Sequence, residues 1–495
     1  MAALFSDDIR KRILAKITPT QKEIDQQKKV ISTLKTALSN YPSSENYSFS
    51  FIEAQGSTGR KQTQLRDAAD IDLFVGLRPE DYSNILEKPL PERRNELDEL
   101  MNGMVRVWFE PAISQLKTTN VQKAYSQHPY LSLEMRSLEV DILGCFDINS
   151  KTLAENGPIT AVDRTVHHTR YVADRLTDQK REDVRIFKSF VKASHAYGDR
   201  CAVGRMGITG VALELLVLVS DSLSHAFDSL RNLDEIPIDP LERPLKILRE
   251  NPAFRDDYLI LIDPTDHQRN IASSFTPRAY EWMKYRIDKL TEVSRTGTDD
   301  KMLEMTLQTS IPTKEVPKWL KDHALTREFK SDGRKHYTVL RDKLYSIANK
   351  IQLNLQYERT GEPRFGETLF EVYFEGDNYV IGILTEAPEI SEKYVRRGPP
   401  TDMVEACDEF RKKHAEVEER EGFLWTTEKR TWRNPHDFTD QILEENPIES
   451  LKPVSKEGII SRKVLNVLYR YILPIETSFL KKITKHKEGN LEIPW

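Results

Sequence analysis

Apolar residues recur along this chain with two different periods, and each period predicts one kind of element. In 48–54, 70–75 and 138–143 they occupy alternate positions, which predicts three short strands that each bury one face. In 9–17 and 30–38 they recur every three or four positions, which predicts two helices with one apolar side. We expect these helices to pack against the sheet that the strands form.

The remainder of the chain shows the same two patterns in a different order. Residues 161–230 are mostly helical by this criterion and include a very apolar helix at 211–219. Residues 368–374 and 379–383 alternate and flank the turn residues 375–378, which predicts a hairpin. The predicted fold class is therefore α+β in a multidomain chain. The expected domains are a strand-containing N-terminal domain at 1–158, a mostly helical central domain at 159–295 and an α+β C-terminal domain at 296–495.

Composition limits the class of protein. The 495 residues include 31% charged and 38% hydrophobic ones, which is typical of a soluble multidomain protein. The longest apolar run, 212–219, is interrupted by Glu214 and is too short to cross a bilayer. The first eight residues lack the basic and apolar segments of a secretion signal, so we expect a cytoplasmic protein without a membrane segment. Three cysteines without metal-ligand spacing argue against a disulfide framework and a zinc site.

The charge pattern indicates a nucleic-acid partner only in local clusters of basic residues and not in the chain as a whole. A net charge of −5 does not indicate a polyanion partner for the chain as a whole. Basic residues nevertheless gather in the last third of the chain, at 393–397, 429–433 and 481–487. A single cluster of this kind is more often an ordinary solvated surface. Their shared location predicts a face that binds a nucleic-acid backbone.

The most informative chemistry is a pair of alternating acids at the start of a predicted strand. Asp70 and Asp72 project from the same face, where two carboxylates can hold a hard cation such as Mg²⁺. An Asp-x-Asp pair alone is more often a solvated strand face, but the small-residue turn Gly56-Ser57 precedes it and can hold phosphate oxygens. Asp141, in the third strand, offers another carboxylate. Three carboxylates can hold the two metal ions of nucleotidyl transfer.

A set of motifs in the same chain order resembles the archaeal-type, class I CCA-adding tRNA nucleotidyltransferases of the polymerase-β-like superfamily. The matching blocks are 56–60 with 65–66 and 70–72, then 161–168, 184–198, 263–270 and 397–400. The first block is shared by the whole superfamily, and the ordered set narrows the resemblance to this family. It implies that 1–158 is a nucleotidyltransferase head with a short mixed sheet, 159–295 a helical neck and 296–495 a tRNA-binding body and tail.

The resemblance also implies roles for the three acids. Asp70, Asp72 and Asp141 would hold two Mg²⁺ ions, and Asp141 would assist deprotonation of the primer 3′-hydroxyl. Archaeal members commonly have Glu at the position of Asp70, which gives this chain a shorter reach to the same ion.

Seven further residues match family positions around the incoming nucleotide: Ser57, Arg60, Thr165, His168, Lys188, Tyr197 and Arg269. The resemblance implies that Ser57 and Arg60 contact the triphosphate. It also implies that Arg269 contacts the edge of the base, where a guanidinium can present paired hydrogen-bond donors. The other four would surround the phosphates and the sugar. The segment after Arg60 is one residue longer than usual, so Lys61 could take the role of Arg60.

Two of these residues share a site only under one condition. On one straight helix Lys188 and Tyr197 would lie about half a turn apart around the axis. They can meet only if the helix ends before Tyr197, and Gly198 is compatible with such an ending.

The resemblance implies addition of CMP, CMP and AMP from CTP and ATP to the 3′ end of tRNA, with release of pyrophosphate. The acceptor arm of tRNA would bind the basic C-terminal surface by shape and phosphate contacts. Two alternatives remain open: an oligonucleotide-synthesising or cyclising nucleotidyltransferase with the same acids, and a non-catalytic RNA-binding protein on the same fold. The sequence does not decide between a monomer and a homodimer, or whether the whole CCA end is added.

Overall fold

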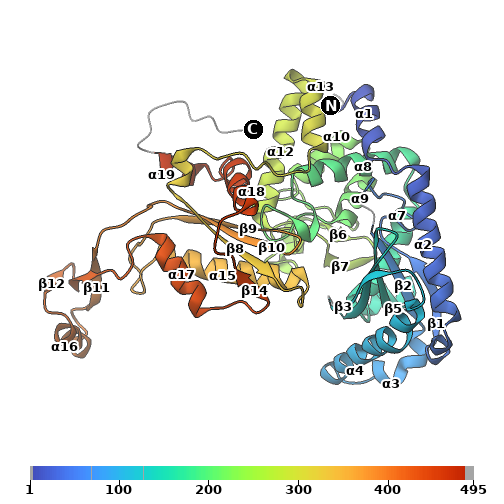
Figure 1. The fold of residues 1–495 in the computed structure, drawn as a ribbon, viewed down its shortest axis with the longest axis horizontal. Helices are drawn as coiled ribbons and strands as arrows, with labels where there is room; N and C mark the ends of the chain where they lie inside the picture. The colour runs from blue at the N-terminus through green and yellow to red at the C-terminus, as the bar shows by residue number, and fades with distance from the viewer. Residues whose placement is uncertain (1–3, 68–69, 126–127, 485–495) are drawn as a thin grey trace. The chain divides into compact units, whose positions relative to one another are not determined.

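The computed structural model describes residues 4–67, 70–125 and 128–484 and divides the chain into two compact units. The first comprises 1–200 and 206–309, and the second comprises 201–205 and 310–495. Helices and several small sheets occur in both, so the predicted α+β multidomain class is confirmed (Figure 1). The finer division of the first unit into a head at 1–158 and a neck at 159–295 stays a prediction.

A five-stranded mixed sheet forms the N-terminal part of the first unit, in the order β1-β2-β5-β4-β3. Its strands are β1 (Phe49–Ala54), β2 (Ile71–Leu77), β3 (Thr119–Tyr125), β4 (Pro129–Met135) and β5 (Leu138–Phe146). β2 and β5 run parallel, whereas the other neighbours are antiparallel. All three strands expected in this region are present. The parallel pairing is the feature that positions the acids, because it places the start of β2 beside the start of β5.

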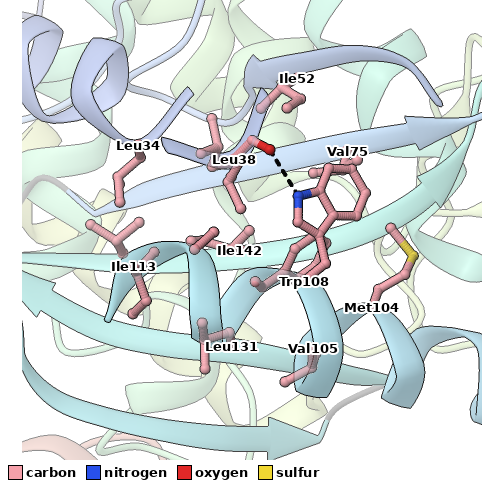
Figure 2. Close-up of a cluster of buried hydrophobic side chains, with 14 of the residues drawn as sticks. Leu34, Leu38, Ile52, Val75, Met104, Val105, Trp108, Ile113, Leu131 and Ile142 are labelled. Carbon is pink, nitrogen blue, oxygen red and sulfur yellow. Dashed lines mark hydrogen bonds between the residues drawn. The ribbon is translucent and has the colours of Figure 1, made fainter. Parts of the chain in front are cut away.

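One face of this sheet is covered by helices and contains the main apolar core of the unit. The covering segments are α2 (Gln21–Asn40), α3 (Ser83–Leu86), α4 (Leu90–Gly103), a π-helical turn (Met104–Phe109) and α5 (Glu110–Ile113). Trp108 is fully buried there, and its indole Nε1–H donates to the Leu38 carbonyl oxygen at 2.8 Å (Figure 2). Because Ile71, Leu73 and Val75 also enter this core, the residues between them on β2 must point to the opposite face.

The rest of the first unit is helical apart from one small hairpin. Its helices are α1 (Asp7–Ile17), α6 (Ser150–Asn156), α7 (Arg164–Ala173), α8 (Asp178–Ala193), α9 (Gly210–Val219), α10 (Leu223–Arg231), α11 (Leu245–Glu250), α12 (Pro277–Thr296) and α13 (Asp299–Leu307). The hairpin consists of β6 (Ile262–Asp263) and β7 (Asp266–Asn270). The helical pattern read from 161–230 is therefore confirmed. No single helix in the described part of the chain has the length and apolar character to cross a membrane, although the bent pair α9 and α10 passes on those two criteria together.

The second unit contains a four-stranded and a three-stranded antiparallel sheet. The first has the order β14-β8-β10-β9, with β8 (Ala324–Ser331), β9 (Thr368–Glu375), β10 (Asn378–Thr385) and β14 (Leu451–Pro453). The second has the order β11-β13-β12, with β11 (Lys393–Pro400), β12 (Val417–Arg420) and β13 (Phe423–Lys429). β9 and β10 pair directly across the turn, so the hairpin expected at 368–383 is confirmed.

Helices complete the second unit: α14 (Lys318–Lys321), α15 (Tyr337–Gln356), α16 (Val404–Lys413), α17 (Pro435–Glu445), α18 (Ile459–Val467) and α19 (Thr477–Thr484). The basic cluster at 393–397 lies on β11, and 429–433 begins at the end of β13. Lys481 and Lys482 lie on α19, whereas 485–487 of the third cluster lie outside the described residues.

Candidate active site

The three predicted acids lie at one end of the parallel strand pair. Asp72 on β2 is directly opposite Asp141 on β5, and Asp70 immediately precedes β2. Burial, followed by the charges of Asp70 and Asp141, raises the pKa of Asp72 to about 7. Burial also raises the pKa of Asp141 to about 6, although a hydrogen bond from Ser132 opposes it. Burial of Asp72 and Asp141, together with the neighbouring charge of the exposed Asp70, creates an environment that a cation stabilises.

The donor set suits a hard divalent ion. Among the residues that the structure describes, no three acidic, histidine or cysteine side chains converge closely enough to enclose a metal ion. Carboxylate oxygens are the ligands that Mg²⁺ prefers, and it fills its remaining positions with water and phosphate oxygens rather than a closed protein cage. Burial, with a smaller contribution from neighbouring acids, raises the pKa of Asp72 and Asp141, and the charge of a bound divalent ion would oppose both effects. The acids thus fit such an ion chemically.

The loop after β1 passes directly over Asp72. Gly56 has a φ of +66°, and a Cβ at this position would lie 2.6 Å from Asp72 Oδ2. Glycine is therefore required both by the backbone conformation and by the close approach. The Gln55 N–H donates to the Asp72 carbonyl oxygen at 2.8 Å, and the Thr58 hydroxyl donates to the Asp70 carbonyl oxygen at 2.9 Å. Ser57 is half-buried at this turn.

Arg60 and Lys61, the two alternatives for the triphosphate, point to different environments. The Arg60 side chain is 58% exposed, and its Nη2 lies 3.2 Å from Glu53 Oε1 on β1. The Lys61 side chain is only 7% exposed, and its Nζ donates to Glu214 Oε2 at 2.7 Å. The charge of Lys61 acts on Asp72, where it opposes the effect of burial on the pKa of that acid. Of the two cations, Lys61 is therefore the one electrostatically coupled to the acids.

Lys188 lies on α8 and is fully engaged by protein groups. Its Nζ donates to Glu214 Oε1 at 2.7 Å, to Thr63 Oγ1 at 3.0 Å and to the Thr63 carbonyl oxygen at 3.5 Å. Burial lowers the pKa of Lys188, and the charge of Glu214 opposes this. Burial would raise the pKa of Glu214, but Lys188 and Lys61 outweigh it and lower that pKa to about 2.

Tyr197 and Lys188 meet because α8 ends early. The helix ends at Ala193, and the chain then turns through His195, whose φ is +54°. A Cβ on Gly210 would lie 2.6 Å from Tyr197 Oη and 3.5 Å from Lys188 Cε, so both side chains reach the start of α9. The condition expected from the sequence is met. Burial raises the pKa of the Tyr197 hydroxyl, with neighbouring acids adding to the effect.

A second group of predicted residues surrounds Asp263 at the β6–β7 hairpin. His168 Nε2 on α7 lies 2.5 Å from Asp263 Oδ2, and Arg269 Nη1 lies 3.4 Å from the same oxygen. Burial acts to raise the pKa of Asp263, but the hydrogen bonds from His168 and Thr265 outweigh it and lower that pKa to about 2. Thr165 is half-buried one turn before His168 on the same helix.

Sequence analysis missed three residues that organise these groups: Thr63, Glu214 and Asp263. Glu214 is the single charged residue in α9, and it is buried among apolar residues of that helix. A buried charge requires a partner, so its position in an apolar helix was a usable signal. Asp263 lies in a motif that was recognised, but its partners His168 and Arg269 could be identified only from the fold.

Three comparisons relate this chain to known proteins. Residues 182–295 match the family model described as "tRNA nucleotidyltransferase, second domain". The CCA-adding enzyme of Saccharolobus shibatae is 26% identical over 413 residues, covering 83% of this chain and 85% of the relative. The CCA-adding enzyme of Sulfolobus acidocaldarius is 25% identical over 431 residues, covering 86% and 89%. Among solved structures, Escherichia coli MS115-1 CdnC with ATP aligns over 62% of this chain and 99% of that one, with a TM-score of 0.43 and 14% identity.

Proposed function

We infer that this chain is a CCA-adding tRNA nucleotidyltransferase of the archaeal type, which adds CMP, CMP and AMP to the 3′ end of tRNA from CTP and ATP without a template. Similarity to curated CCA-adding enzymes over about four fifths of both chains carries this inference. The match of 182–295 to a tRNA nucleotidyltransferase family model, and the three acids at the start of β2 and on β5, support it independently. We expect the enzyme to act in the cytoplasm.

In this mechanism Asp70, Asp72 and Asp141 would hold two Mg²⁺ ions. Such ions would lower the pKa of the primer 3′-hydroxyl and neutralise charge on the departing pyrophosphate. Asp141 lies on the central strand of the sheet and accepts the proton from the 3′-hydroxyl oxygen.

The remaining predicted residues bind the incoming nucleotide. Ser57 and the turn at Gly56 hold phosphate oxygens beside Asp72, together with Arg60 or Lys61. Lys188 and Tyr197 border the same site from α8 and the chain that follows it. These assignments are supported by the motif matches and by the approach of the loop to Asp72.

The base and sugar are assigned to the group around Asp263. Asp263 orients Arg269 through one Nη1 contact, so the remaining guanidinium N–H groups are left to meet the acceptor edge of a base. His168 shares the same carboxylate oxygen, and Thr165 precedes it by one turn. We propose that this group reads the base and contacts the sugar, while the basic clusters at 393–397 and 429–433 of the second unit bind the tRNA acceptor arm.

The test uses radiolabelled CTP and ATP with tRNA that lacks its last three nucleotides. Ordered addition of two C residues and one A, with CTP required first, is the expected result. Soluble oligonucleotides formed from nucleotides alone would favour the oligonucleotide-synthesising or cyclising alternative. Absence of any incorporation, with tRNA binding retained, would favour the non-catalytic RNA-binding alternative. Gel filtration with light scattering distinguishes a monomer from a homodimer.

A further inference from the structure

The roles proposed above leave one groove of the second unit unused. It has a volume of about 550 Å³ and lies between β8, the C-terminal half of α17 and the chain on both sides of β14. A volume of this size is typical of sites that bind small molecules. None of its lining residues belongs to the candidate active site or to the basic clusters at 393–397 and 429–433.

The floor of the groove is apolar. Phe329 on β8 and Leu451 on β14 are 4% and 6% exposed and belong to the core of this unit. Leu443 and Ile448 pack against the same core, and Val454 is 42% exposed. A ligand in the groove would therefore cover aliphatic and aromatic surface, which favours binding of a molecule with apolar parts.

The charged residues that line the groove make it negative. Four carboxylates and two cations give the lining a net charge of −2, and they are Glu328, Asp440, Glu444, Glu457, Arg327 and Lys456. Asp440 is already neutralised, because Arg327 Nε donates to its Oδ1 at 2.5 Å and Arg327 Nη2 to its Oδ2 at 2.8 Å. Lys456 is the one other cation of the lining, so it can balance at most one of the three remaining acids.

Those three acids have no cationic partner among the residues that the structure describes. Glu328 Oε1 accepts from the Gly458 N–H at 2.6 Å, and Glu457 Oε1 accepts from the Thr326 hydroxyl at 2.7 Å, so both contacts are with neutral donors. Glu444 on α17 has neither a hydrogen-bond partner nor an ion-pair partner in the described ranges. The groove therefore offers acceptors and negative charge from three separate elements.

These features argue against three kinds of ligand. The negative charge repels RNA, so the groove does not extend the proposed tRNA-binding surface. It also repels the phosphates that could complete the coordination of a metal ion, and in the described parts of the chain no three acids converge closely enough to enclose such an ion alone. β14 has three residues and ends at Pro453, which has no N–H, so it offers little to a peptide that pairs as an added strand.

We propose that this groove binds an aliphatic polyamine. Such a molecule carries ammonium groups separated by short methylene chains, which matches separate carboxylates beside an apolar floor. Its methylenes would cover Phe329 and Leu451. One ammonium group would pair with Glu444 on α17, and another with Glu328 on β8 or Glu457 after β14. An ammonium group donates hydrogen bonds only, and the free groups of the lining acids are acceptors.

The test measures binding of spermidine to the full chain by calorimetry, without tRNA because polyamines also bind RNA. Glu444→Gln is expected to raise the Kd for spermidine about threefold, because one solvent-exposed ion pair is lost. The matched control is Glu445→Gln, which removes the same charge from the same helix at a residue that does not line the groove. The control is expected to leave the Kd unchanged. Equal effects of the two substitutions, or no binding by the wild type, would overturn the proposal.

A third variant separates the groove from the acids of the first unit. Asp72→Asn removes one of the carboxylates at β2 and β5, which could also attract a polycation. It is expected to leave the Kd for spermidine unchanged. A loss of affinity equal to or larger than that of Glu444→Gln would place the polyamine at those acids and overturn the proposal.

Two competitors test the shape of the ligand. Hexaamminecobalt(III) has the same charge as spermidine but is compact and has no methylene chain, so it is expected to displace spermidine at least about tenfold less effectively. Equal displacement would show that net charge alone attracts the ligand. The tripeptide Lys-Leu-Lys is also expected to bind more weakly than spermidine, and tighter binding would assign the groove to a peptide. Either of these two results would overturn the proposal.

Discussion

Each unit of this protein buries one glutamate between two cations, and the two clusters differ in what surrounds them. In the first unit Glu214 pairs with Lys61 and Lys188 next to the acids of the sheet. In the second unit Glu358 accepts from Arg364 Nε at 2.8 Å and from Arg430 Nε at 2.7 Å. The charge pattern is the same, but the first cluster includes Lys61, whose charge acts on Asp72.

The two clusters use different cations, arginine around Glu358 and lysine around Glu214, and this difference suits them to different roles. Arg430 also donates to the carbonyl oxygens of Ser391 and Lys393 at 3.0 Å each, and Arg364 donates to that of Asn354 at 3.3 Å. A guanidinium has five donors in a fixed plane, so it can tie several chain segments together. A lysine ammonium is a compact charge with three donors, which suits it to present charge at one point. The cluster around Glu358 therefore connects several loops through its arginines, whereas the cluster around Glu214 places two compact lysine charges in the first unit.

The largest expected effect tests whether the chemistry resides only in the first unit. Asp72→Asn should lower nucleotide incorporation into tRNA by at least about 10³-fold, because it removes a carboxylate that holds the ion. The same variant removes one of three repelling acids, so its Tm at about pH 8 should equal or exceed that of the wild type. Full incorporation by a folded Asp72→Asn protein would show that the acids are not the catalytic centre.

The second prediction compares how much Glu214→Gln and Glu358→Gln lower the free energy of unfolding. Removal of one partner from a buried ion group costs about 3–5 kcal/mol. In Glu358→Gln the arginines stay charged at every accessible pH, so the loss should be similar at about pH 6.5 and about pH 9. In Glu214→Gln a buried lysine, whose folded pKa is lowered, can release its proton, so the loss should shrink as pH rises toward its unfolded value of about 10.4. Urea unfolding of both variants at the two pH values measures this, and equal pH dependence would remove the distinction.

Asp263, a carboxylate that contacts both Arg269 and His168, predicts a smaller and purely functional effect. Arg269→Lys keeps the charge but loses the planar pair of donors. We expect kcat/KM for nucleotide addition to fall about tenfold, with a changed ratio between CTP and ATP and an unchanged Tm. Steady-state kinetics with each nucleotide measures the ratio. A uniform loss for both nucleotides would place Arg269 away from the base.

The smallest expected effect is the pH dependence of stability that arises from Asp72 and Asp141. Because the pKa of Asp72 is raised to about 7 and that of Asp141 to about 6, the folded protein retains protons that the unfolded chain loses above about pH 4. Without divalent ions, stability should therefore fall as pH rises from about 4 to about 7. Mg²⁺ binds the deprotonated acids, so it should raise Tm by a few degrees more at about pH 8 than at about pH 5.5. Thermal unfolding measures this, and Asp72→Asn is the control that should lose most of the difference.

The sequence predicted those parts of the fold and site that depend on local pattern. Alternation revealed β2 and β5, and the acids between the apolar residues of β2 had to face away from the core. The early end of α8, needed to bring Tyr197 to Lys188, followed from the same kind of local reasoning.

The remaining features depend on contacts between distant parts of the chain. Glu214 meets Lys61 from 153 positions away, and His168 meets Asp263 from 95 positions away. No local periodicity encodes such pairs, because they arise when separate elements pack together. The division at 201–205 was invisible for the same reason, since the Gly204 N–H donates to Glu371 Oε2 at 2.8 Å, 167 positions later.

The assignment of 201–205 to the second unit has a consequence for how this protein can be recombined. The polypeptide passes from one unit to the other after 200, after 205 and after 309, so neither unit is a single uninterrupted segment of the gene. An exchange of modules between homologues at 309 alone would separate Gly204 from its own Glu371 and pair it with a foreign strand. Chimeras should therefore retain full function only when these five residues and the C-terminal segment come from the same parent.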